Sequence, residues 1–157
     1  MKIIRINYYL LFTLLLIALD QITKLLIYGY IKPHDSIVIN DFLSLSHVHN
    51  YGAAFSFLAD QSGWQRYFLS GFSLVASIAI IIWMRRTDAG RLLKLFALSI
   101  LLAGAIGNLI DRFLLGFVID FIDLHYQDFY WPVFNVADVL ISLGVILLIF
   151  SDIKKHE

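Results

Sequence analysis

Residues 67–84 read YFLSGFSLVASIAIIIWM and contain no charged side chain. A helix needs about 20 mostly apolar residues to cross about 30 Å of hydrocarbon, so this stretch predicts a membrane-spanning helix over Tyr67–Met84. The rest of the chain agrees with it, because 60% of the 157 residues are hydrophobic and 15% are charged. Soluble domains average roughly 45–50% apolar and about 25% charged residues. The sequence therefore predicts a membrane protein.

Three other charge-free runs lie at Ile6–Leu19, Leu95–Ile110 and Val139–Ser151. The first and the last are too short to span a bilayer unless each helix extends through a carboxylate, Asp20 or Asp138. On that reading the remaining helices lie near Tyr8–Tyr28, Leu92–Ile110 and Asn135–Phe150. The predicted fold class is an all-α membrane protein with four transmembrane helices in one domain over residues 1–157.

Lysine and arginine near the ends of the spans predict the orientation, because such residues gather on the cytoplasmic side. Eight of the twelve fall on one side of the predicted helices: Lys2, Arg5, Arg85, Arg86, Arg91, Lys94, Lys154 and Lys155. Both termini are therefore expected in the cytoplasm. Nine of the twelve acids fall on the other side, where function is to be sought: Asp20, Asp35, Asp41, Asp60, Asp111, Asp120, Asp123, Asp128 and Asp138.

Two segments outside the spans differ in character. Residues 35–50 place β-branched residues around Asn40-Asp41, which predicts a small extracytoplasmic β-hairpin. Residues 112–133 are aromatic and acidic and are expected to form an interfacial flap, partly buried among lipid headgroups.

Composition excludes several function classes. The formal net charge is zero, which argues against nucleic-acid binding, and the absence of cysteine excludes disulfides and thiolate chemistry. His47 and His49 would share one face of a strand, but no His-Glu-x-x-His motif or third ligand accompanies them, so they are expected to be surface histidines. These residues therefore predict no metal site.

Asp138 and Asp120 are the candidate catalytic residues. Asp138 lies at the outer edge of the fourth span, where an ionisable group is costly and indicates function by default. Asp120 stands between apolar neighbours, which raises a carboxyl pKa. Two carboxyl groups that meet at one cleft can act as general acid and general base. Each residue also has a structural alternative. Asp138 could be a carboxylate that reaches water or pairs with Arg112, and Asp120 could be an acid in an interfacial loop.

Other polar residues are candidates for support. Asp20 and Lys24 are four residues apart and can pair on one helix face, and Asn108 with Asp111 and Asn135 with Asp138 share faces by the same rule. Arg112 could bind a carboxylate or a lipid phosphate. Residues 50–56, NYGAAFS, allow close backbone approach at the outer side of the second helix, although these residues taken alone favour a simple tight turn. A Ser56–Lys24 hydrolase is disfavoured, because Lys24 has Asp20 beside it and no nucleophile motif surrounds Ser56.

In order along the chain, these segments resemble the bacterial lipoprotein signal peptidases, the type II signal peptidases. The resemblance is carried by DQITK at 20–24, NYGAAFS at 50–56, GNLIDR at 107–112, GFVIDF at 116–121 and FNVAD at 134–138. It covers nearly the whole chain.

The resemblance implies an aspartic endopeptidase of the bacterial cytoplasmic membrane, with its active site toward the extracytoplasmic face. Its substrate would be a prolipoprotein that carries diacylglycerol on the cysteine after the cleavage point, and its inhibitors would be globomycin-type cyclic peptides. It would contact membrane lipid and would need no metal or organic cofactor. Apart from the resemblance, an enzyme with four spans could act alone, so a monomer is expected. The family's catalytic pair maps onto Asp120 and Asp138. Its supporting positions map onto Asp20, Lys24, Asn50, Gly52, Asn108, Asp111, Arg112 and Asn135.

Two other function classes compete with this one. A small ion or proton transporter would use acids as a relay, but the inner halves of all four predicted spans lack them. A structural subunit of a larger membrane complex would tolerate Asp120→Asn together with Asp138→Asn, which a catalytic dyad would not.

Overall fold

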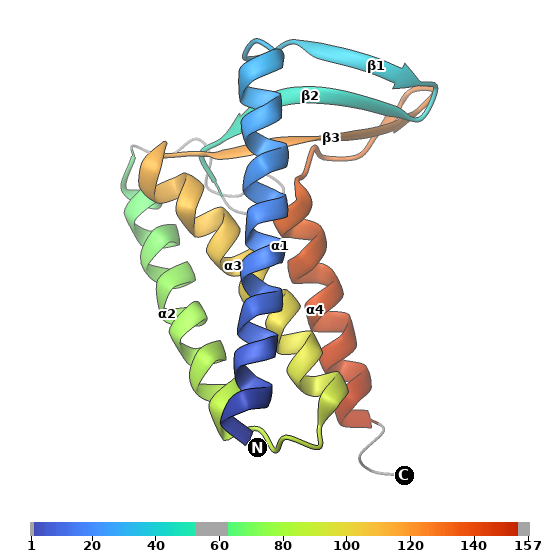
Figure 1. Ribbon diagram of the computed structural model, residues 1–157. Helices are drawn as coiled ribbons and strands as arrows, with labels where there is room; N and C mark the ends of the chain where they lie inside the picture. Colours follow the sequence, from blue (N-terminus) through green and yellow to red (C-terminus); the bar gives the residue numbers. More distant parts are fainter. Residues whose placement is uncertain (1, 53–62, 154–157) are drawn as a thin grey trace.

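The computed structural model describes residues 2–52 and 63–153 and contains four long helices and a small sheet (Figure 1). The helices are α1 (Lys2–Tyr30), α2 (Trp64–Arg86), α3 (Leu92–Leu114) and α4 (Val136–Ile153). The strands are β1 (Ser36–Asn40), β2 (Leu43–Asn50), β3 (Val118–Tyr126) and β4 (Phe129–Tyr130). The sheet lies at one end of the helices, and the end of the sheet with the β1–β2 turn extends past α4.

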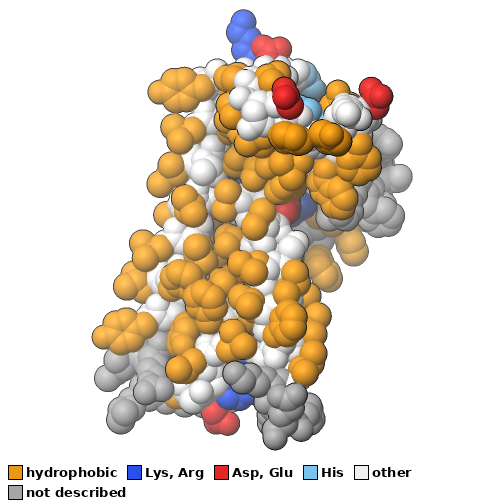
Figure 2. Space-filling model, turned by 90° about the vertical axis from the view of Figure 1, so that its right-hand side faces the viewer, with side chains coloured by type: hydrophobic (Ala, Val, Ile, Leu, Met, Phe, Trp, Pro, Cys, Tyr) orange, Lys and Arg blue, Asp and Glu red, His pale blue; other side chains and the backbone are white. Residues whose placement is uncertain are grey.

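In the described part of the chain, four helices are long and apolar enough to cross a membrane: Ile6–Tyr30, Trp64–Arg86, Leu92–Leu114 and Val136–Ile153. The prediction of four spans is therefore confirmed, with each helix beginning or ending within a few residues of its expected bounds. Apolar side chains cover the flank of the helices, while charged groups gather at the two ends (Figure 2). This is the distribution that a lipid environment requires.

The helix α3 is the centre of the bundle, since it packs against α1, α2 and α4. Small residues allow α4 to approach it closely. A Cβ atom on Gly144 would lie 2.8 Å from the backbone nitrogen of Leu101, and one on Gly104 would collide with the carbonyl oxygen of Ala137. The contact between α3 and α4 therefore fixes the position of the first turn of α4, where Asp138 lies.

The predicted hairpin is confirmed as β1 and β2, which pair antiparallel with Val38 opposite Ser44. The Asn40 side chain closes the turn by accepting a hydrogen bond of 2.8 Å from the Phe42 backbone N–H. This is the local bond by which asparagine favours turns.

The separate flap predicted over residues 112–133 is not confirmed. Its first residues end α3, and most of the remainder forms β3 and β4 in the same antiparallel sheet, in the order β1-β2-β3-β4. Asp120 lies opposite Val48 of β2. Backbone hydrogen bonds to β2 hold this segment in place, so Asp120 occupies a central strand rather than a loop on the membrane surface.

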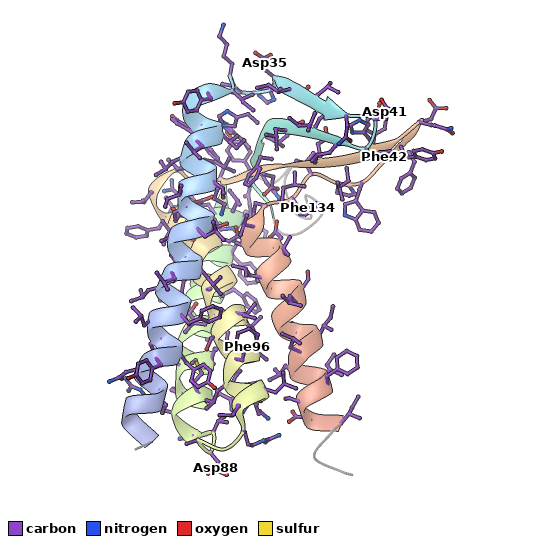
Figure 3. The ribbon with its side chains drawn as sticks, turned by 45° about the vertical axis from the view of Figure 1, so that its right-hand side comes forward. Asp35, Asp41, Phe42, Asp88, Phe96 and Phe134 are labelled. Atoms are coloured by element: carbon purple, nitrogen blue, oxygen red, sulfur yellow. The ribbon has the colours of Figure 1, made fainter. Side chains whose placement is uncertain are left out.

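The two ends of the molecule carry different groups. Asp35, Asp41 and the sheet lie at one end, and Asp88 in the turn between α2 and α3 lies at the other (Figure 3). The helix α1 begins and α4 ends at the end of the bundle where α2 connects to α3 (Figure 1). The two ends of the described chain are thus on the same side of the bundle, as a protein with four spans requires.

Candidate active site

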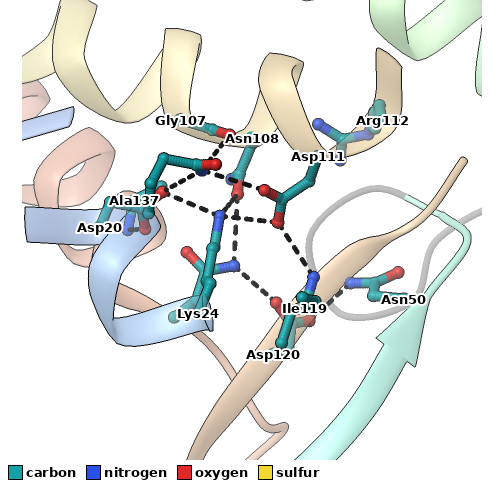
Figure 4. Close-up of polar contacts among 12 residues, drawn as sticks. Asp20, Lys24, Asn50, Gly107, Asn108, Asp111, Arg112, Ile119, Asp120 and Ala137 are labelled. Carbon is teal, nitrogen blue, oxygen red and sulfur yellow. Dashed lines mark hydrogen bonds and ion pairs between the residues drawn. The ribbon is translucent and has the colours of Figure 1, made fainter. Parts of the chain in front are cut away.

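The candidate site lies where α1, α3 and the beginning of α4 meet the strands β2 and β3 (Figure 4). Eight of the ten predicted site residues are linked there through their side chains, and the other two, Arg112 and Gly52, join through the Gly52 backbone. The network has two parts: an ion cluster around Lys24 and an amide cluster around Asp120 and Asp138.

Asp120 is buried in β3, with an exposed fraction of 2%. Its Oδ1 accepts a hydrogen bond of 2.6 Å from the Asn135 amide, and its Oδ2 accepts one of 2.9 Å from the Asn50 amide. Burial, and next the nearby Asp138 carboxylate, raise the pKa of Asp120 to about 7. A carboxyl group with such a pKa can hold a proton near neutral pH and give it up during a reaction.

Asp138 lies in the first turn of α4, where it forms a reciprocal capping pair with Asn135. The Asp138 backbone N–H donates to Asn135 Oδ1 at 3.0 Å, and the Asn135 backbone N–H donates to Asp138 Oδ2 at 3.3 Å. This bonding satisfies backbone donors that a helix leaves free at its N-terminus. The other oxygen, Oδ1, accepts a hydrogen bond of 2.8 Å from the Asn108 amide.

Asn135 connects the two aspartates, because its amide donates to Asp120 while its backbone N–H and side-chain oxygen bond to Asp138. The same amide is 3.3 Å from Asn108 Oδ1. Since Asn108 Oδ1 accepts from both Asn135 and Lys24, its NH₂ group is left to face Asp138. The predicted supporting role of the two asparagines thus has a geometric basis: they set which atoms face each carboxyl group.

The ion cluster consists of Lys24 between two carboxylates. Its Nζ lies 3.0 Å from Asp20 Oδ2 and 3.0 Å from Asp111 Oδ2, and all three side chains are at most 3% exposed. The predicted Asp20–Lys24 pair is therefore present. Breaking a buried pair by removing one partner is strongly destabilising, since it leaves an uncompensated charge.

The two carboxylates of the ion cluster also hold backbone groups. Asp20 Oδ1 accepts a hydrogen bond of 2.8 Å from the Ala137 N–H in the first turn of α4. Asp111 Oδ2 accepts one of 3.1 Å from the Ile119 N–H, next to Asp120 in β3. One cluster thus fixes the segments that carry both candidate catalytic residues.

Sequence reasoning assigned no role to Gln21, which completes the ion cluster. Its amide donates to Asp20 Oδ2 at 3.1 Å, to Asp111 Oδ1 at 3.0 Å and to the Gly107 carbonyl oxygen at 3.2 Å. Its place in the DQITK segment was the only signal. Arg66 was also missed: it donates to the carbonyl oxygens of Arg112 and Phe113 at 3.0 and 2.9 Å and so caps the end of α3.

Arg112 and Gly52 lie beside the amide cluster. The Arg112 guanidinium donates a hydrogen bond of 3.1 Å to the Gly52 carbonyl oxygen, and the Gly52 N–H donates to Asn50 Oδ1 at 2.9 Å. The second bond turns the Asn50 NH₂ group toward Asp120. The remainder of the NYGAAFS segment, including Ser56, lies outside the described residues.

The surface position expected for His47 is wrong. It is 1% exposed, with Nδ1 at 2.7 Å from the Ile31 carbonyl oxygen and Nε2 at 3.1 Å from His49 Nε2. The end of α1 covers this part of β2, which the alternation of β2 could not reveal. Burial, His47 and His34 lower the pKa of His49. Within residues 2–52 and 63–153, no three His, Asp or Glu side chains are arranged to hold a metal ion.

Asp120 and Asp138 line one pocket of about 450 Å³, which we call the sheet-side pocket. Its other walls are largely apolar: Trp131, Pro132, Val133 and Phe134 on one side, and Val139, Leu143 and Ile146 of α4 on the other. Phe134 lies beneath the sheet at the beginning of α4 (Figure 3). Two carboxyl groups at the head of an apolar pocket can activate water and protonate a bound carbonyl group.

Comparisons with known proteins agree with this arrangement. A family model described as signal peptidase (SPase) II matches residues 12–154. The lipoprotein signal peptidase of Pseudoalteromonas atlantica is 43% identical over 140 residues, which is 89% of this chain and 85% of that protein. The lipoprotein signal peptidase of Cupriavidus pinatubonensis is 44% identical over 144 residues, 92% of this chain and 81% of that protein.

The fold also matches solved structures. A bacterial membrane enzyme determined by the in meso method at 2.3 Å resolution superposes with a TM-score of 0.83 and 35% identity, covering 96% of this chain and 90% of that chain. A second bacterial membrane enzyme, determined by the same method at 1.9 Å resolution, superposes with a TM-score of 0.77 and 36% identity, covering 92% of each chain.

Proposed function

The chain belongs to the signal peptidase II family, and from this premise we propose that it cleaves diacylglyceryl-modified prolipoproteins immediately before the lipidated cysteine, with Asp120 and Asp138 as the catalytic pair. It is a membrane aspartic peptidase with several spans, and prolipoprotein processing is the activity of its relatives. The transporter alternative is not favoured by this membership. One observation carries the assignment of the pair: two carboxyl groups from separate elements line one pocket and share Asn135.

Asp138 is the general base in this proposal. Its carboxylate lies at the N-terminus of α4, where the helix dipole and free backbone N–H groups favour negative charge. The Asn108 amide and the Asn135 N–H donate to its two oxygens and further stabilise the ionised form. An ionised Asp138 can take a proton from a water molecule held in the pocket.

Asp120 is the general acid. Burial and the nearby charge of Asp138 together raise the pKa of Asp120 to about 7 and so favour its protonated form. Its proton goes to the oxygen of the scissile carbonyl as water attacks the carbon. The C–N bond then breaks as the leaving nitrogen takes the proton held by Asp138, and one hydroxyl group of the tetrahedral intermediate returns a proton to Asp120 as it becomes the carboxyl group of the product. Water is thus divided between the two products, and no covalent enzyme intermediate forms.

The supporting residues act on the pair in two ways. Asn50, Asn108 and Asn135 orient the carboxyl groups directly. Asp20, Lys24 and Asp111 hold α4 and β3 in place through the backbone, with Lys24 also fixing the Asn108 amide. A globomycin-type inhibitor would occupy the sheet-side pocket and compete with substrate.

The test is cleavage of a purified diacylglyceryl prolipoprotein in detergent or lipid, followed by gel mobility. The wild-type chain is expected to release the signal peptide, and Asp120→Asn and Asp138→Asn are each expected to lose at least 1,000-fold in rate. Asp123→Asn is the matched control, because Asp123 lies on the same strand but bonds to Ser46 and does not line the pocket. Normal cleavage by either Asn variant would contradict the dyad, and no cleavage by the folded wild-type chain would contradict the function.

A further inference from the structure

A second apolar pocket begins at Asp138 and runs in another direction. It has a volume of about 390 Å³ and lies between α2, α3 and α4, and we call it the interhelical pocket. It shares only Asp138 and Ser142 with the sheet-side pocket. These two residues are one turn apart on α4, so the beginning of α4 separates the two pockets.

The proposed substrate also has two apolar parts that diverge from one point. The signal helix precedes the scissile bond, and the diacylglyceryl group is attached to the residue that follows it. We infer that the interhelical pocket receives the apolar helix of the signal peptide and that the sheet-side pocket receives the acyl chains. This inference rests on the proposed function and adds to it which part of the substrate each surface recognises.

The shape of the interhelical pocket suits a helix. Its walls are α2, from Leu69 to Ile80, and α4, and its floor is α3, from Leu101 to Arg112. Eleven residues of helix rise about 16 Å, so the pocket follows the bundle axis for about three turns. Ser73, Ala76 and Ala105 are among its lining residues, and small side chains let helices approach closely in membranes.

The sheet-side pocket suits acyl chains instead. One wall is the irregular segment Trp131–Phe134, and the other is α4 from Asp138 to Ile146, a length of about 12 Å. An acyl chain has no polar backbone and needs only apolar contact, whereas a helix in lipid packs against other helices. Trp131, which lines this pocket, is of a residue type that prefers the membrane interface, where the glyceryl esters of a lipid lie.

Tryptophan substitutions can narrow one pocket at a time. Leu143→Trp narrows the sheet-side pocket and Ala76→Trp the interhelical pocket. The matched controls are Ile149→Trp on α4 and Val75→Trp on α2, since both residues are more than half exposed and line neither pocket. Each variant is assayed on one prolipoprotein carrying either two palmitoyl or two octanoyl chains, and on signal peptides with a Leu-rich or an Ala-rich apolar segment.

Leu143→Trp is expected to lower kcat/KM for the dipalmitoyl substrate at least tenfold more than for the dioctanoyl substrate. Ala76→Trp is expected to lower kcat/KM equally for the dipalmitoyl and the dioctanoyl substrate. It is also expected to lower kcat/KM at least tenfold more for the Leu-rich than for the Ala-rich signal peptide. The reverse pattern, or unchanged selectivity in both folded variants, would overturn the inference. Failure of the wild-type chain to cleave any of these substrates would instead contradict the proposed function.

A second measurement needs no activity. The Asp120→Asn chain carries a photoreactive benzoylphenylalanine at position 76 or 143 and is irradiated with bound substrate. The glyceryl esters are then hydrolysed with alkali. A chain with the photoreactive residue at position 143 is expected to remain cross-linked to an acyl chain, and a chain with it at position 76 is expected to remain cross-linked to the signal peptide. Exchange of the two labels would overturn the assignment even if the tryptophan variants failed to fold.

Discussion

Four aspartates near one another, of which Asp20, Asp111 and Asp120 are buried and Asp138 is half-buried, have two kinds of partner. Asp20 and Asp111 face the Lys24 ammonium, which neutralises charge and secures structure. Asp120 and Asp138 instead accept hydrogen bonds from asparagine amides, which orient a carboxyl group without supplying a full positive charge. In the second arrangement a proton can move more easily, because the hydrogen bonds that the structure shows to these two carboxyl groups come from amide and backbone N–H groups and not from a lysine or an arginine.

Asp120 predicts a pH dependence of stability. Its pKa of about 7 in the folded chain lies above the value near 4 of an unfolded aspartate, so the folded chain binds this proton more tightly. The contribution of Asp120 to the free energy of unfolding is therefore full below about pH 4 and is lost as the pH rises through about 7. At about 1.4 kcal/mol for each pH unit, the loss is on the order of 4 kcal/mol.

Thermal unfolding in detergent between pH 4 and pH 8 measures this effect. Asp120→Asn should remove most of the decline in the unfolding midpoint, whereas Asp123→Asn, on the same strand, should keep it. Equal pH profiles for the wild-type chain and Asp120→Asn would show that burial does not favour the protonated form.

Among the elements, the close contact between α3 and α4 sets the place of Asp138. Gly144→Ala would bring a Cβ atom within 2.8 Å of the Leu101 backbone, and a backbone cannot turn aside as a side chain can. The helices must separate, so we expect a loss of about 1–3 kcal/mol in the free energy of unfolding. Displacement of Asp138 should also lower kcat/KM at least tenfold, because catalytic groups tolerate little misplacement.

Gly71→Ala on α2 is the control for this substitution. A Cβ atom there meets nothing within 4 Å, and alanine favours a helix by about 1 kcal/mol over glycine. Its stability should be unchanged or higher and its activity normal. If Gly144→Ala behaved in the same way, the close α3–α4 contact would not constrain the site.

The same elements show what local sequence could predict. The spans followed from runs without charge, and the Asp20–Lys24 pair followed from a spacing of four residues within one helix. The pairing of β3 with β2 could not be predicted from local sequence. Asp120 lies opposite Val48, which is in a distant part of the chain, and no local pattern encodes that register. The bonds from Lys24 to Asp111 and from Asp20 to the Ala137 N–H depend on tertiary packing in the same way.

At the scale of the whole molecule, charge differs between the two ends. The end near Asp88 carries Arg85, Arg86, Arg91 and Lys94, while the sheet end carries the two aspartates of the candidate active site. Since short cytoplasmic segments are rich in lysine and arginine, the Asp88 end should face the cytoplasm. The active site then opens toward the outer leaflet, where a lipidated substrate that has crossed the membrane would meet it.

The absence of cysteine from the chain makes this orientation directly measurable. Asp41→Cys places one thiol in the β1–β2 turn and Asp88→Cys places one in the α2–α3 turn, at opposite ends of the molecule (Figure 3). In intact spheroplasts, a membrane-impermeant maleimide should label position 41 and should label position 88 only after the membrane is opened. Both substitutions lie in turns outside the helices and the pockets, so activity should be retained and should confirm that the labelled chains are folded. Labelling of position 88 alone in intact cells would place the two aspartates on the cytoplasmic side, where a translocated lipoprotein precursor could not reach them.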